Sequence, residues 1–88
     1  MPTAEEFRTE LDRIFYEAFH NRQPTVDANA GDLHRRVGGY PSSNHRMPVC
    51  CEVMRSAMDS DAGDIVLSQP PKGNGPTLTI RYILPRQD

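Results

Sequence analysis

The sequence predicts one α+β domain over residues 1–88, with three helices followed by a C-terminal β-hairpin. Apolar residues recur at helical spacing in three separate segments within the first two thirds of the chain. Near the C-terminus they alternate at strand spacing instead, around a segment rich in proline and glycine that is typical of an exposed turn. The length of 88 residues leaves room for a single hydrophobic core.

The first helix is predicted over residues 4–20. Thr3 and Glu6 have the spacing of a capping box, in which each side chain accepts a hydrogen bond from the other residue's backbone N–H. Acidic residues are concentrated in the following turns, where the helix dipole favours negative charge. The apolar residues at helical spacing are Phe7, Leu11, Ile14 and Ala18, with Phe15 beside them.

The second helix is predicted over residues 30–37. Leu33 and Val37 stand one helical turn apart, and the glycines that follow them are typical of a helix end. Either Asp27 or Asn29 can cap the start of this helix, because their short side chains accept hydrogen bonds from the first backbone amides.

A third helix is predicted over residues 47–58, after a loop at 38–44 in which Tyr40 packs over the turn. Pro48 is acceptable in the first turn because its missing N–H is not needed there. One half of this helix is apolar and carries Val49, Cys50, Val53, Met54, Ala57 and Met58. The other half, which we expect at the surface, carries Cys51, Glu52, Arg55 and Ser56.

The hairpin strands are predicted over residues 64–68 and 77–84, joined by the turn QPPKGNGP at 69–76. Val26 is expected to form a one- or two-residue strand that, if paired, makes the sheet three-stranded. The core expected from all these patterns consists of Phe7, Leu11, Ile14, Phe15, Ala18, Leu33, Val37, Val49, Val53, Met54, Ile65, Leu67, Leu78, Ile80 and Tyr82.

The order of these elements carries a family resemblance. Its residues are Leu33 and Val37 of the second helix, the Gly38-Gly39 stop, the Val49, Val53 and Met54 face of the third helix, and the hairpin 64–84 with its tip PPKGNG. Over nearly the whole chain this order resembles the winged helix-turn-helix superfamily, so the resemblance implies a winged-helix fold. In that superfamily the third helix usually enters the DNA major groove, and the hairpin wing contacts the backbone or the minor groove.

The resemblance implies a set of DNA-contacting residues on the third helix and on the wing, which here is residues 69–76. Arginine and lysine neutralise phosphates, and small polar side chains donate further hydrogen bonds to the backbone or the bases. Two arginines of the second helix are additional candidates for phosphate contacts. The candidate nucleic-acid-binding residues are Arg35, Arg36, Arg46, Arg55, Ser56, Lys72 and Asn74.

The charge distribution leaves two function classes open. The net charge of −2 argues against a general binder of polyanions, but basic residues outnumber acidic ones in 22–58 and in 70–88. The preferred hypothesis is a small DNA-binding protein with a role in transcription regulation, favoured by the basic residues of the third helix and the wing. The alternative is a winged helix used as a protein–protein interaction module within a larger complex, favoured by the acidic first helix and by Glu52.

The two adjacent cysteines do not suggest a metal centre. On a helix, Cys50 and Cys51 point about 100° apart and cannot easily share one ion with His34 or His45. We therefore expect no metal and no cofactor, with Cys50 in the core and Cys51 partly exposed. His45 is expected to cap or brace the start of the third helix, and the absence of a partner cluster around Asn44-His45-Arg46 predicts no enzymatic activity.

Other features concern partners and location. No apolar run approaches the length of about 20 residues that a membrane span requires, so we expect no membrane association. The acidic N-terminus is unlike a secretory signal, and neighbouring cysteines do not form a disulfide framework, so a cytoplasmic location is expected. Small winged helices often pair through terminal helices, so Tyr16 and Phe19 mark a candidate homodimer seam on the first helix.

Overall fold

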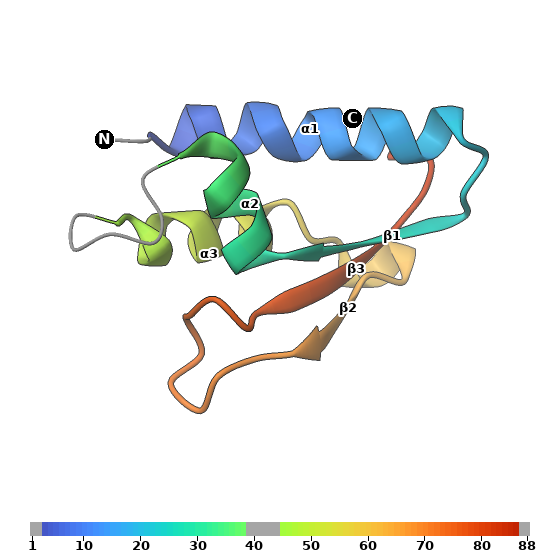
Figure 1. The fold of residues 1–88 in the computed structure, drawn as a ribbon. Coiled ribbons are helices and arrows are strands. Elements are labelled where there is room, and N and C mark those ends of the chain that lie inside the picture. The colour runs from blue at the N-terminus through green and yellow to red at the C-terminus, as the bar shows by residue number, and fades with distance from the viewer. Residues whose placement is uncertain (1–2, 39–44, 87–88) are drawn as a thin grey trace.

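The computed structural model describes residues 3–38 and 45–86, and within these ranges the chain forms three α-helices and a three-stranded antiparallel sheet (Figure 1). A short 3₁₀ turn, η1, lies between the last helix and the hairpin. In chain order the elements are α1 (Ala4–His20), β1 (Thr25–Asn29), α2 (Ala30–Val37), α3 (Met47–Ser56), η1 (Ser60–Ala62), β2 (Ile65–Ser68) and β3 (Thr79–Ile83).

The helices agree closely with the sequence prediction. The capping box of α1 is present, because the Glu6 N–H donates to Thr3 Oγ1 at 3.2 Å and the Thr3 N–H donates to Glu6 Oε1 at 2.9 Å. Asn29 caps α2 by accepting the Asp32 N–H at 3.0 Å. Helix α3 ends at Ser56, two residues before its predicted end. The predicted packing of Tyr40 lies outside the described residues.

The predicted order of three helices followed by a hairpin is corrected by β1. This strand of five residues lies between α1 and α2, and its whole length pairs with β3, with Val26 opposite Tyr82. The sheet is therefore three-stranded, as expected if Val26 pairs, but β1 is longer than the one or two residues predicted. The sequence TVDAN is polar and lacks the pattern of a strand, so the predicted strand is too short. Pairing with β3 along the whole segment provides hydrogen-bond partners for its backbone groups.

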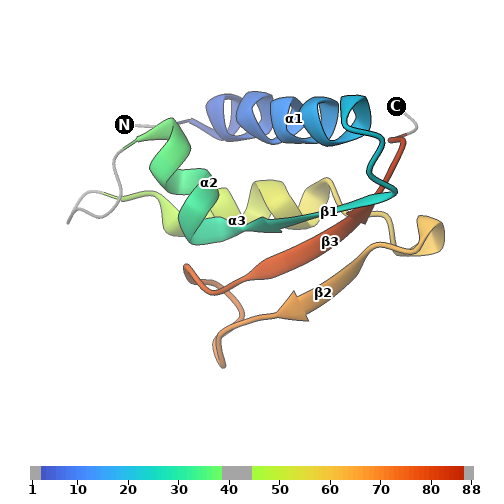
Figure 2. The same cartoon turned by 45° about the vertical axis from the view of Figure 1, so that its right-hand side comes forward.

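Strand β3 lies in the centre of the sheet, in the order β1-β3-β2. Ala28 of β1 and Val66 of β2 both stand opposite Ile80, and the pairing of β2 becomes irregular between Val66 and Ser68. Figures 1 and 2 show that β2 is the strand farthest from α1. The hairpin thus extends away from the first helix, with the wing at its end.

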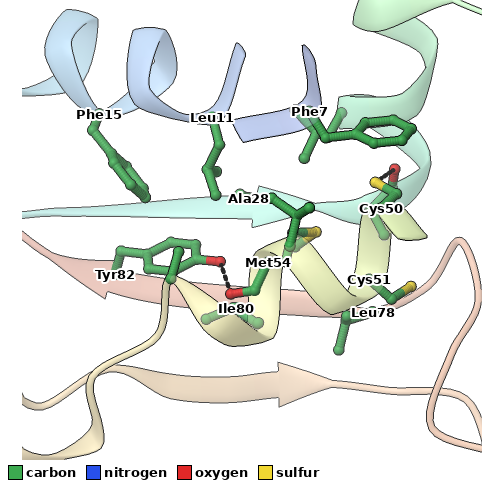
Figure 3. Packing of buried hydrophobic residues seen from close by; sticks show 14 of the residues in the cluster. Phe7, Leu11, Phe15, Ala28, Cys50, Cys51, Met54, Leu78, Ile80 and Tyr82 are labelled. Atoms are coloured by element: carbon green, nitrogen blue, oxygen red, sulfur yellow. Dashed lines mark hydrogen bonds between the residues drawn. The ribbon is translucent and has the colours of Figure 1, made fainter. Parts of the chain in front are cut away.

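The core lies between α1, α3 and β3 (Figure 3). The rings of Phe15 and Tyr82 meet edge to face at a centroid distance of 4.8 Å. The Tyr82 hydroxyl, fully buried, donates to the Met54 carbonyl at 2.8 Å, so this polar atom is satisfied inside the core. The fully buried apolar side chains predicted from the sequence are Phe7, Leu11, Leu33, Met54, Leu78, Ile80 and Tyr82.

Two predicted core residues are wrong. Ile65 is 49% exposed and Leu67 is 41% exposed. The pairing register explains this, because Val66 stands opposite the buried Ile80, so its neighbours on β2 point to the other face of the sheet. Ile14, Val37 and Val49 are only partly buried. The core also includes residues outside the expected list. Ala57 and Leu84 lie on apolar faces that the patterns did indicate, whereas Ala28, Ala30, Met47 and Cys51 were missed.

A buried ion pair joins the end of the hairpin to the helices. Asp64, which is 1% exposed, forms an ion pair with Arg86 at 2.8 Å. Its other contacts are backbone amides, since the Asp59 N–H donates to Oδ2 at 2.8 Å and the Ile83 N–H donates to Oδ1 at 2.7 Å. One carboxylate therefore connects the segment after α3, the start of β2 and the end of β3.

Arg86 extends this network into the core. Its Nη2 donates to the Ala57 carbonyl at 2.6 Å, just beyond the end of α3. Its guanidinium lies 5.1 Å from the ring centroids of both Phe15 and Tyr82. Burial alone would raise the pKa of Asp64, but the two backbone amides and Arg86 outweigh it, so the pKa lies below its ordinary value.

This network predicts how stability depends on pH. Because the pKa of Asp64 is lowered by folding, its ionised form contributes stability that is complete above about pH 4 and is lost as the pH falls through the folded pKa. Asp64→Asn should reduce the free energy of unfolding at pH 7 by about 3 kcal/mol, because Arg86 loses its partner, and should flatten the acid dependence. Urea unfolding measured between pH 7 and pH 3 tests both effects.

The control is Asp61→Asn, which removes a carboxylate from the exposed side of the neighbouring η1 turn. It should leave both the stability at pH 7 and its acid dependence close to those of the wild type. An Asp64→Asn variant that behaves like this control would contradict the assigned role of the ion pair.

Candidate functional site

The start of α3 is fixed by two imidazole rings. The Arg46 N–H donates to His34 Nε2 at 2.9 Å, and the Met47 N–H donates to His45 Nδ1 at 3.2 Å. The bracing role predicted for His45 is confirmed. His34 was not singled out for this role, yet it is fully buried on α2, where its ring meets Phe7 edge to face at 4.9 Å. These contacts set the position of α3 relative to α2.

The outward face of α3 carries exposed Pro48, Glu52 and Ser56. Ser56 Oγ donates back to the Val53 carbonyl of its own helix at 3.0 Å. The predicted exposure of Cys51 is wrong, because this side chain is fully buried. The helical wheel carries no information on the loop that folds over that side of α3 and makes Cys51 part of the core.

The wing is that loop. The Gly75 N–H donates to Cys51 Sγ at 3.4 Å, and the thiol donates to the Gly75 carbonyl at 3.5 Å. Arg55 Nη2 donates to the Gly73 carbonyl and, at 3.1 Å, to Gln69 Oε1. The Gly31 N–H of α2 donates to the Pro76 carbonyl at 3.1 Å. The wing is thus held by α3 and α2 through several points.

Two of the predicted DNA contacts lie on the wing. Lys72 and Asn74 are both exposed, and the hydrogen bonds that hold the wing are made by Gln69, Gly73, Gly75 and Pro76. Among residues 3–38 and 45–86, no ion pair involves Lys72. Lys72 and Asn74 flank Gly73, whose carbonyl accepts a hydrogen bond from Arg55 of α3.

The arginines of α2 are directed elsewhere. Arg35 forms an ion pair with Asp32 of its own helix at 3.1 Å, and Arg36 forms one with Glu10 of α1 at 3.1 Å. Hydrogen bonding to Arg13 is the largest effect that lowers the pKa of Glu10, and Arg36 adds to it. The end of α2 lies beside α1, on the opposite side of the molecule from the wing (Figures 1 and 2). The structure therefore does not bring these two candidates together with the others.

Arg46 shares a shallow depression with the outward face of α3. This depression, of about 420 Å³, lies between the start of α1 and α3, and Glu52 and Ser56 also line it. Two further basic residues lie toward the wing, namely Arg55 on α3 and Lys72 on the wing itself. The surface is therefore mixed in sign, with basic residues at the start of α3 and on the wing and with Glu52 between them.

A second surface feature is apolar. Tyr16 is 64% exposed and Phe19 is 52% exposed, as the predicted homodimer seam requires. Together with Leu84 and Pro85 they line a groove of about 260 Å³ between α1 and the C-terminal segment. The homodimer itself stays a prediction.

Comparison of the chain with protein-family models, with curated proteins and with solved structures found no match. In the part of the chain that the structure describes, none of the helices combines the length and apolar character needed to cross a bilayer. Within the same residues, no three histidine, cysteine or acidic side chains are grouped as metal ligands.

The cysteines provide a test of the wing contacts. Burial, with the adjacent Cys51, raises the pKa of Cys50 to about 12, and burial also raises the pKa of Cys51 against the opposing effects of Gly75 and Arg55. Both thiols should therefore react slowly in the folded protein, because the thiolate is the reactive form. The rate of reaction with a chromogenic disulfide, measured separately in Cys50→Ala and Cys51→Ala, checks this. A Cys50→Ala variant that reacts as fast in buffer as in urea would contradict the buried position of Cys51.

The exposed aromatics provide a test of self-association. If α1 pairs with its counterpart, light scattering after gel filtration should give twice the chain mass for the wild type. Tyr16→Ser combined with Phe19→Ser should give the single chain mass, because both side chains are surface residues whose loss leaves the core intact. A wild type that stays monomeric at the highest soluble concentration would exclude the dimer.

Proposed function

We propose that the chain is a winged-helix domain that binds duplex DNA through the outward face of α3 and the wing. The order of elements supports this, because a helix, a strand, two helices and a hairpin follow each other as in the superfamily that the sequence resembles. The wing projects from the β2–β3 hairpin next to the third helix, where that resemblance expects it.

One observation carries the proposal. The wing is held against α3 and α2 by backbone groups and by side chains other than those at its tip, which leaves Lys72 and Asn74 exposed next to α3. A lysine in that place can neutralise a phosphate while the helix faces the groove.

The proposed contact set is smaller than the one predicted from sequence. Arg46 and Lys72 neutralise phosphates and Asn74 donates neutral hydrogen bonds, while Ser56, whose hydroxyl proton already goes to the Val53 carbonyl, offers only an acceptor. Arg35 and Arg36 are left out because carboxylates of α2 and α1 already compensate them. With about two neutralised phosphates, affinity should fall about tenfold between 50 and 200 mM salt, which is a weak electrostatic dependence.

A second candidate function is a protein–protein interaction module. The observation that favours it is the apolar groove at the end of α1, with its two exposed aromatic side chains, because such residues often anchor protein partners. The mixed charge of the α3 surface also favours a protein partner over DNA, because Glu52 would repel phosphates. This function would use a different surface from the DNA interface, so the two can be tested separately.

Fluorescence anisotropy with a labelled random duplex, at 50 and 200 mM salt, tests the DNA proposal. Lys72→Ala should weaken binding to all sequences equally and reduce the salt slope by about one unit, because a wing lysine contacts the backbone. Glu52→Gln should strengthen binding, because it removes a negative charge from the surface that meets DNA.

The control is Arg13→Ala, which also removes one positive charge but from the exposed side of α1. It should leave the salt slope unchanged. A wild type that does not bind at 50 mM salt, or a Lys72→Ala variant that is indistinguishable from the control, would refute the DNA proposal.

A further inference from the structure

Arg55 is the candidate DNA contact whose surroundings differ most from the sequence prediction. Its guanidinium lies against the wing, where Nη2 donates to the Gly73 carbonyl and to Gln69 Oε1 at 3.1 Å. We propose that Arg55 is a positioning residue that holds the wing on α3 and thereby presents Lys72, rather than a residue that contacts DNA. The effect of Arg55 on DNA binding rests on the proposed function. The hydrogen bonds by which Arg55 holds the wing, here called the clamp, can be tested without DNA.

The geometry of the wing tip explains how one side chain can position another. The Gly73 N–H donates to the Pro70 carbonyl at 2.9 Å, which closes a four-residue turn with Lys72 at its third position. Gly73 has a φ of 90°, a conformation that L residues with side chains rarely adopt. The turn directs the Gly73 carbonyl toward Arg55 while Lys72 stays exposed.

A second contact one helical turn away supports the first. Cys51 precedes Arg55 by four residues, so both side chains lie on the same side of α3. Cys51 exchanges hydrogen bonds with Gly75, two residues beyond the carbonyl that Arg55 binds. A Cβ on Gly75 would lie 2.8 Å from Pro70 Cγ, so the wing is closely folded on itself here. The helix thus holds the wing at two points.

Arginine suits this role because of its shape and charge. Its planar group offers several N–H donors, and hydrogen bonds from a charged donor are stronger than neutral ones. Arg55 uses the same nitrogen for a backbone carbonyl and a side-chain amide of the wing, and it is only partly exposed. Glutamine at this position has no charge, and its shorter side chain does not extend to the Gly73 carbonyl.

Limited trypsin digestion of the full chain tests the clamp without DNA. Trypsin cleaves after Lys72, at the turn that Arg55 holds, and mass spectrometry quantifies the fragments. Arg55→Gln should increase the rate of this cleavage about tenfold, which is the effect expected on local opening when a charge-assisted hydrogen bond is lost. Arg13→Gln, on the exposed side of α1, is the matched control and should leave the rate unchanged.

Cleavage after Arg81, in the central strand β3, reports loss of the whole fold in the same digestion. It should stay at the wild-type rate in Arg55→Gln. An unchanged rate after Lys72 would overturn the clamp, and so would an equal increase at Lys72 and Arg81, because the wing would then have no contact of its own to lose.

A double-mutant cycle on DNA affinity tests the consequence. If Arg55 acts only by holding Lys72 in place, Arg55→Gln should weaken binding about as much as Lys72→Ala, and it should have almost no further effect in the Lys72→Ala background. Additive losses would mean that Arg55 contacts DNA itself and would overturn its positioning role. Absence of wild-type binding would refute the proposed function, while the digestion would still decide whether Arg55 holds the wing.

Discussion

The buried pair of Asp64 and Arg86 is the contact on which the arrangement of the hairpin and the helices depends. Asp64 accepts hydrogen bonds from backbone amides of the segment after α3 and of the end of β3. Arg86 also donates to the Ala57 carbonyl just after α3. A buried carboxylate without these donors is strongly unfavourable, so the fold is stable only when the three segments meet at this point. The pair closes the hairpin at the end opposite the wing, which fixes the direction in which the wing projects.

Helix α3 is consequently held from several sides. At its start, the rings of His34 and His45 accept hydrogen bonds from the first backbone amides. Beyond its end, Arg86 donates to the Ala57 carbonyl. Along its length the core side packs on α1 and β3, while Cys51 and Arg55 hold the wing. A helix restrained in this way presents its remaining face in a fixed orientation, which is a requirement for any surface that recognises a rigid partner.

Sequence patterns predicted the helices and the inward faces well, because periodicity reports which residues a helix or strand turns toward the core. They failed where a residue's environment is set by a neighbour distant in the chain. Cys51 is buried by the wing, Ile65 is exposed because its register opposite Arg81 of β3 places it on the outer face of the sheet, and Arg36 is compensated by Glu10 of another helix. Of the seven candidate contacts, Lys72 and Asn74 are exposed on the wing as predicted. The partners of Arg36 and Arg55 are distant in the chain and no local pattern contains them, whereas Asp32 and Arg35 stand three residues apart on one helix.

The use of arginine in this chain bears on the kind of DNA binding that is proposed. Arg36, Arg81 and Arg86 each pair with a carboxylate from another segment, so much of the positive charge serves the fold rather than a ligand. The outward face of α3 carries Glu52 and Ser56, and its one arginine, Arg55, is bound to the wing. That face therefore presents no arginine for bidentate contacts with guanine. An interface with so few cations has little electrostatic affinity to lose, and its binding therefore depends on the accuracy with which α3 and the wing are placed relative to each other. This is why a residue that fixes the wing can matter to DNA binding as much as one that contacts the phosphates.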